Sequence, residues 1–309
     1  MRKLLRRIPL SLFAAFLGLA AGLGLWEIID ATQKNAVREL YNQQLEENLE
    51  QRARETLIHF NHSLNSYKTA AQLLASHRRI PNYLNPLYWF SDDQDPVIVY
   101  ENEPPPWLPE PSRWKPLVSP SHILLIDSQG TLRELYQAQQ IPLPEGLVAL
   151  LPEYRATGES RVHLVTFDEQ PWLLASTVAE DAAYNIMGTL MLVVPVDETF
   201  LQSAQPGLGS ETLFTALLDA EAQSVLASSN NNAIPPGTIR DSVESRFAVT
   251  SQIIEKNIET GITMLFATFI PRATVDRISI KIVRLDQRQR SIMALSFIAF
   301  FSLLFMFVS

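Results

Sequence analysis

The side chains best suited to binding a ligand gather between positions 154 and 184 of the sequence. Small-molecule sites combine apolar walls with a few polar groups, and this stretch offers both around short apolar runs. The predicted ligand-contacting residues are Tyr154, Arg161, Trp172, Asp181 and Tyr184. The alternative for each of them is an ordinary place in the core or on the surface. An unknown small molecule is the expected partner.

No residue pattern in the sequence predicts catalysis. The motifs G-x-S-x-G, Walker A, G-x-G-x-x-G and HExxH do not occur. Ser112 to Lys115 match S-x-x-K, but they lie among prolines and lack the partner motifs. His59 and His62 share a helix face and are too few for a metal site. We therefore expect no catalytic residue, no metal and no cofactor, and Asp127 is expected to form a local turn.

The composition argues against nucleic acid as a partner and predicts a membrane protein. The chain has 309 residues, no cysteine and a net charge of −8, and no basic stripe with aromatics predicts nucleic-acid binding. Apolar residues concentrate at the two ends, in residues 8–29 and in residues 291–309. The 22 residues of the first run exceed the ~20 apolar residues of a membrane helix, and the 19 residues of the second approach them. We predict two transmembrane helices there, a cleaved signal peptide being the alternative for the first.

Basic residues predict the orientation of the chain. Four of them lie in residues 1–7, which places this start in the cytoplasm. Residues 30–290 are then periplasmic, and the protein is an inner-membrane protein of a bacterium. A second basic group precedes the second span and opposes this orientation: Lys281, Arg284, Arg288 and Arg290. The first helix usually dominates the outcome, so we retain the predicted orientation.

Residues 30–81 are predicted to form one long extracytoplasmic helix, since Ala31 to Ile80 contain neither proline nor glycine. Pro81 is expected to end it. A heptad seam runs along this helix through Leu57, Phe60, Leu64, Tyr67, Ala71 and Leu74. The seam predicts packing on the helix's own domain, or additionally on a second copy in a homodimer. Residues 82–121, rich in proline and aromatics, read as an irregular connection outside the core.

Two modules with an α+β pattern follow, at residues 122–205 and 206–272. In the first, residues 122–136 predict a β-hairpin, 161–179 two strands, and 188–203 a strand and a short helix. In the second, 213–228 predict a hairpin and 247–254 a strand, and 261–279 repeat the pattern of 188–203. We predict two tandem antiparallel-sheet modules, a single mixed sheet with long insertions being the alternative.

The segment 273–290 is predicted to be a helix that joins the second module to the second span. Its apolar residues keep a heptad phase into the span: Val275, Ile278, Ile282 and Leu285. These four residues are the predicted signal-transmission positions.

This layout resembles bacterial transmembrane sensor receptors with double-Cache or CHASE extracytoplasmic domains, whose modules are PAS-like. The likeness is carried by the helix 31–80, by ILLIDSQG, by LLASTVA followed by GTLMLVVPVDETFL, and by the helix from Ala273. The resemblance implies a homodimeric sensor half of a two-component histidine kinase, with any kinase activity in a further C-terminal part. The family's amino-acid-binding signature is not found in this sequence.

Other functions fit the same layout. The chain could be the sensor half of a diguanylate cyclase or a chemoreceptor. It could also be a two-span membrane scaffold such as a polysaccharide chain-length regulator, since those proteins commonly end soon after the second span. Two hairpin-rich modules favour ligand reception over a scaffold.

Overall fold

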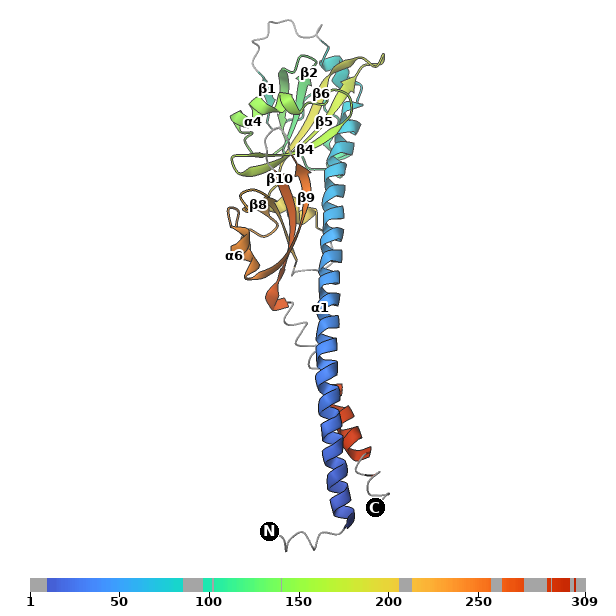
Figure 1. The fold of residues 1–309 in the computed structure, drawn as a ribbon. Coiled ribbons are helices and arrows are strands. Elements are labelled where there is room, and N and C mark those ends of the chain that lie inside the picture. Colours follow the sequence, from blue (N-terminus) through green and yellow to red (C-terminus); the bar gives the residue numbers. More distant parts are fainter. Residues whose placement is uncertain are drawn as a thin grey trace. The chain divides into compact units, whose positions relative to one another are not determined.

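The computed structural model describes residues 10–85, 97–101, 103–139, 141–205, 213–256, 263–274, 288–289, 291–300 and 303 (Figure 1). The chain divides into two compact units. One holds the described residues of Met1–Gln51 and Pro271–Ser309, and the other holds those of Arg52–Ile270.

Groups of consecutive strands are separated by short helices along the chain. The helices are α1 Leu10–Ala75, α2 Arg79–Tyr83, α3 Pro111–Trp114, α4 Glu145–Leu150, the 3-10 helix η3 Leu151–Tyr154, α5 Glu198–Ser203 and α6 Arg240–Glu244. The strands are β1 Ile98–Tyr100, β2 His122–Asp127, β3 Leu132–Gln137, β4 Arg161–Phe167, β5 Gln170–Glu180, β6 Ile186–Pro195, β7 Phe214–Asp219, β8 Val225–Ser228, β9 Phe247–Lys256 and β10 Thr263–Pro271.

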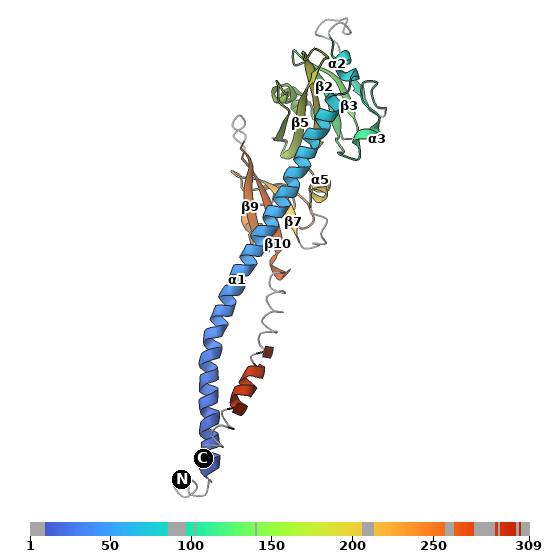
Figure 2. The same ribbon diagram turned by 90° about the vertical axis from the view of Figure 1, so that its right-hand side faces the viewer.

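The first unit contains the beginning of α1 and the helical residues 291–300. These two helical segments lie beside each other in both ribbon views (Figures 1 and 2). A search of the described residues finds no helix with the length and apolarity of a membrane span. The spans predicted for 8–29 and 291–309 each include residues outside the described ranges. The predicted signal-transmission residues Val275, Ile278, Ile282 and Leu285 also lie outside them.

The first module of the second unit is built on a six-stranded sheet in the order β1-β3-β2-β6-β5-β4. The hairpin predicted at 122–136 is confirmed as β2 and β3, and the two strands predicted within 161–179 are β4 and β5. The expected turn role of Asp127 is also confirmed, because its Oδ1 accepts hydrogen bonds from the backbone N–H groups of Gln129 and Thr131 at 2.9 and 2.8 Å. All these strand pairs are antiparallel, whereas β1 pairs with β3 in parallel.

The second module has its own four-stranded sheet, in the order β8-β7-β10-β9. The hairpin predicted at 213–228 is β7 and β8, and β10 pairs with β7 in antiparallel. Two separate sheets confirm the two-module prediction over a single mixed sheet.

Two expectations for the segment between the long helix and the first module are wrong. The helix α1 ends at Ala75, before Pro81, which lies in the first turn of α2. A proline is tolerated there because the N–H groups of a first turn have no partner within the helix. The segment 82–121 is also no mere connection, since it supplies β1 to the sheet and buries Trp107 and Trp114. Buried indole rings contribute strongly to a core because each removes a large apolar area from water.

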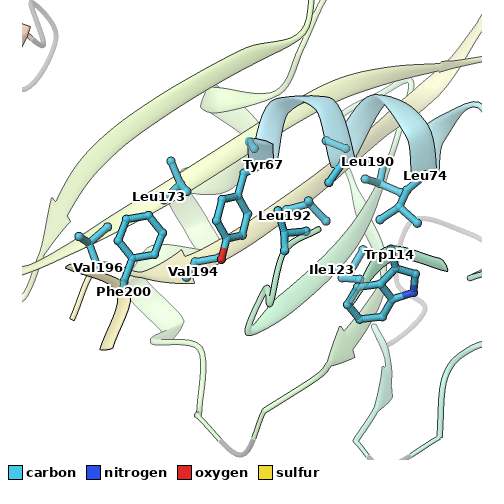
Figure 3. Packing of buried hydrophobic residues seen from close by; sticks show 14 of the residues in the cluster. Tyr67, Leu74, Trp114, Ile123, Leu173, Leu190, Leu192, Val194, Val196 and Phe200 are labelled. Carbon is cyan, nitrogen blue, oxygen red and sulfur yellow. The ribbon is translucent and has the colours of Figure 1, made fainter. Parts of the chain in front are cut away.

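One face of α1 packs against both modules and forms their common core. Phe60 is fully buried, and its ring lies 4.8 Å from that of Phe266 in β10 and 6.3 Å from that of Phe200 in α5. Tyr67 and Leu74 continue this face over the first sheet, as Figure 3 shows. The predicted heptad seam is therefore confirmed as an intramolecular contact. Its buried residues are not available to a second copy, and the homodimer stays a prediction.

The opposite face of the first sheet carries a second core. Alternate residues of β2 divide between the two faces: Ile123 and Leu125 point to the α1 side, and Leu124 and Ile126 point to the other. This second core is covered by α4 and η3, which bury Leu147 and Leu151 (Figure 1). The sheet is thus apolar on both faces.

We expect Phe60→Ala to lower the free energy of unfolding by about 3–5 kcal/mol, because it empties a buried ring site between two modules. The control is Ile58→Ala on the same helix, whose side chain is 66% exposed. That variant should change stability by less than about 0.5 kcal/mol. Urea unfolding of the purified chain in detergent, followed by tryptophan fluorescence, measures both. Equal unfolding midpoints for the two variants would contradict the shared core.

Candidate functional site

A pocket of about 600 Å³ lies between α2 and the β1 edge of the first sheet. Its volume is typical of sites for small organic molecules. Its walls combine apolar groups with phenols, an amide, a guanidinium and a carboxyl group. The lining residues are Arg79, Asn82, Tyr83, Ile98, Tyr100, Pro106 and Glu134.

The parallel pairing of β1 with β3 brings the floor of the pocket together. Ile98 lies directly beside Glu134, and Tyr100 lies beside Tyr136. Since side chains two residues apart on a strand share a face, Ile98, Tyr100 and Glu134 all project to the α1 side of the sheet.

The helix α2 closes the other side of the pocket. Ile80 and Leu84 fix it in the core, with exposed fractions of 0% and 1%. The residues around them, Arg79, Asn82 and Tyr83, are thereby presented to the pocket.

Glu134 is the unusual group of this site. Its exposed fraction is only 1%, although a carboxylate is rarely buried without a partner. The Trp107 Nε1–H donates to its Oε2, and the Tyr100 hydroxyl donates to the same carboxyl group. Burial raises the pKa of Glu134 above its ordinary value, and these two hydrogen bonds oppose that rise without cancelling it.

The two phenols of the pocket respond to the same environment. Burial, followed by the negative charge of Glu134, raises the pKa of Tyr100 to about 12. The same two causes raise the pKa of Tyr83. Both hydroxyl groups therefore stay protonated at neutral pH, which agrees with the hydrogen bond that the Tyr100 hydroxyl donates to Glu134.

At the mouth of the pocket the charge has the opposite sign. Arg79 is exposed, and its Nη1 donates to the backbone carbonyl of Pro106 at 3.0 Å. A guanidinium has five N–H donors, so this bond orients the group and leaves further donors at the mouth. The pocket can bind and orient a small molecule, with a buried carboxyl group at its floor and a guanidinium cation at its mouth.

The structure places the five sequence-predicted site residues elsewhere in the first module. Tyr154 and Trp172 are buried together in the core on the opposite face of the sheet. The hydroxyl of Ser176 in β5 donates to the backbone carbonyl of Tyr154 at 2.9 Å. Arg161 lies on the edge strand β4, opposite Ser176, and its side chain is exposed.

Asp181 and Tyr184 lie in the turn between β5 and β6. The carboxylate of Asp181 accepts hydrogen bonds from Asn185 and from the backbone N–H of Ala183, which lowers its pKa. Tyr184 is 83% exposed. None of the five lines the pocket at β1, and ligand contact by them stays a prediction.

The sequence contained one signal for the residue that was missed. In β3 the two buried residues are Glu134 and Tyr136, which lie two positions apart and share the face of the sheet that packs against α1. A glutamate at an apolar position of a hairpin strand indicates a buried carboxyl group. No pattern indicated Arg79 or Tyr83, because their place at the pocket depends on the break between α1 and α2.

Among the residues that the structure describes, the His, Asp and Glu side chains form no group of three or more that could hold a metal ion.

Comparisons with known proteins find likeness in structure. No protein-family model matches this sequence. No curated protein sequence matches it either. Among solved structures, the periplasmic domain of Vibrio cholerae LuxQ is 14% identical with a TM-score of 0.46, over 71% of this chain and 97% of that one.

Two chemoreceptor domains are also similar. The ligand-binding domain of the Pseudomonas aeruginosa amino-acid chemoreceptor PctC, solved with GABA, is 13% identical with a TM-score of 0.39, over 74% of this chain and 100% of that one. The periplasmic sensory domain of Campylobacter jejuni Tlp1 is 11% identical with a TM-score of 0.31, over 73% of this chain and 93% of that one.

We expect Glu134→Gln to change how stability depends on pH. The raised pKa of Glu134 means that its neutral form stabilises the fold below the ordinary value of 4.5, and that this contribution is lost as pH rises through the folded-state pKa. Glutamine keeps an acceptor for Trp107 and does not titrate. The unfolding free energy of the wild type minus that of the variant should therefore fall as pH rises from 4.5 and then level off. Urea unfolding at a series of pH values measures it, and parallel profiles would refute the buried carboxyl group.

Proposed function

We propose that this chain is the extracytoplasmic sensing region of a bacterial inner-membrane receptor, and that a small molecule bound between α2 and β1 is its stimulus. The single observation that carries the proposal is the pocket with a buried acid against α2. Structural cores rarely retain such a group, whereas binding sites commonly do. The output we propose is a histidine kinase following the second span.

The pocket is coupled to the long helix through a short, hydrogen-bonded junction. The His77 N–H donates to the Leu74 carbonyl at 2.9 Å, and the Ile80 N–H donates to the His77 carbonyl at 2.9 Å. A ligand that moves Arg79 or Tyr83 therefore pulls on residues bonded to the end of α1. That helix is continuous from Leu10 to Ala75, so a displacement is carried along it.

The energetic requirement for signalling is modest. A ligand shifts a two-state receptor only through its different affinities for the two states. A tenfold difference in affinity corresponds to about 1.4 kcal/mol, about the size of one hydrogen bond to a charged group. One such contact, made in only one position of α2, would shift the equilibrium between the two states about tenfold.

Single-cysteine crosslinking tests the proposed signal. The chain has no natural cysteine, so Val275→Cys and Ile278→Cys each introduce a unique thiol into the proposed exit helix. In membranes, we expect a compound that raises the melting temperature of the chain to change disulfide formation between copies at least about twofold. Glu134→Ala should abolish both effects. Crosslinking that is indifferent to every compound bound in the pocket would contradict the receptor.

Reporter fusions test the proposed topology. A phosphatase that is active only in the periplasm should be active when fused after residue 150 and inactive after residue 309. A fusion to a cytoplasmic fluorescent protein should give the reverse pattern. Equal activity at both positions would place them on one side of the membrane and exclude a signal through the second span.

A further inference from the structure

We propose that the pocket at β1 takes a small organic ammonium, with its charged nitrogen beside Glu134 and its apolar body toward the mouth. This inference rests on the proposed function, since it names the chemical class of the stimulus.

The first argument is that the charge of Glu134 is uncompensated. Within the described ranges, no ion pair joins a basic side chain to this carboxyl group. Its sequence neighbour Arg133 projects to the other face of β3, where its Nε donates to Asp127 at 2.7 Å. A buried carboxylate without a cation is costly, and a ligand cation would offset that cost. An anion at the same place would be repelled.

The second argument is the remaining hydrogen-bonding capacity of the carboxylate. Two ionised oxygens offer about four acceptor sites. The indole of Trp107 and the hydroxyl of Tyr100 occupy two of them. The others suit the N–H groups of an ammonium, because a carboxylate accepts and never donates. Tyr83 and Tyr100, whose aromatic rings can attract cations, line the same pocket.

The third argument is the rest of the lining. Ile98 and Pro106 present apolar surface on the way to the mouth, and a hydrocarbon or aromatic body would cover it. Because Arg79 lies at the mouth, two kinds of organic ammonium fit the pocket. A simple amine would use Glu134 alone, whereas an amine that also carries a carboxylate would reach Arg79 with its second group.

Three probes of similar shape separate charge from size: 2-phenylethylammonium, 2-phenylethanol and 3-phenylpropionate. Calorimetry on the purified full chain should show the ammonium binding at least about tenfold more tightly than the alcohol, with the carboxylate weakest. Glu134→Gln should remove this preference. The control is Glu159→Gln, an exposed glutamate of the same module, which should keep it.

Two further measurements sharpen the assignment. Ammonium affinity should fall as pH is lowered through the raised pKa of Glu134, because protonation removes the charge that the probe contacts. For 6-aminohexanoate, a gain over hexylammonium that disappears in Arg79→Gln indicates a ligand carrying both charges. The absence of such a gain indicates a simple amine.

The inference is overturned if the alcohol binds as tightly as the ammonium, if Glu134→Gln leaves ammonium affinity unchanged, or if none of the probes binds. Preferred binding of the carboxylate or the alcohol would overturn the ligand class alone. In that case the sensing function stands when the same compound alters crosslinking at Val275→Cys. Tight ammonium binding without any change in crosslinking would overturn the function and leave the binding site.

Discussion

The rest of the structure depends on the burial of one face of α1 against both sheets. Phe60 is the centre of this contact, because its ring meets Phe200 at the end of the first module and Phe266 in the second. A sheet with an apolar face is stable only when another element covers that face. The helix α1 covers one face of the six-stranded sheet and one face of the four-stranded sheet, so the two modules share one hydrophobic core.

This shared core also explains how a polar pocket can exist at the β1 edge. The helix α2 is anchored by Ile80 and Leu84, so the apolar packing holds the pocket walls in place before any ligand arrives. Hydrogen bonds from Trp107 and Tyr100 offset part of the free-energy cost of burying Glu134. Buried polar groups that are held in place by an apolar core are characteristic of functional sites.

Further contacts join the modules beside the aromatic cluster. The side-chain amide of Gln205 donates to the hydroxyl of Ser229 at 2.8 Å, and that of Gln202 donates to the Ser229 carbonyl at 2.9 Å. Gln202 lies in α5 and Gln205 lies just after it, at the end of the first module, and Ser229 follows β8. Apolar burial and directional hydrogen bonds thus constrain the same junction, which favours movement of the two modules together with α1.

The sequence by itself determined the two hairpins, the long helix and the order of the two modules, because periodicity and turn residues act locally along the chain. It also set the face of α1 that is buried, since Phe60, Tyr67 and Leu74 keep one helical phase. Only the tertiary structure decided that α1 stops at Ala75, that residues 98–100 form a parallel edge strand, and that Glu134 lies beneath α2. Those three features depend on contacts between residues far apart in the chain, and such contacts cannot be predicted from local sequence patterns.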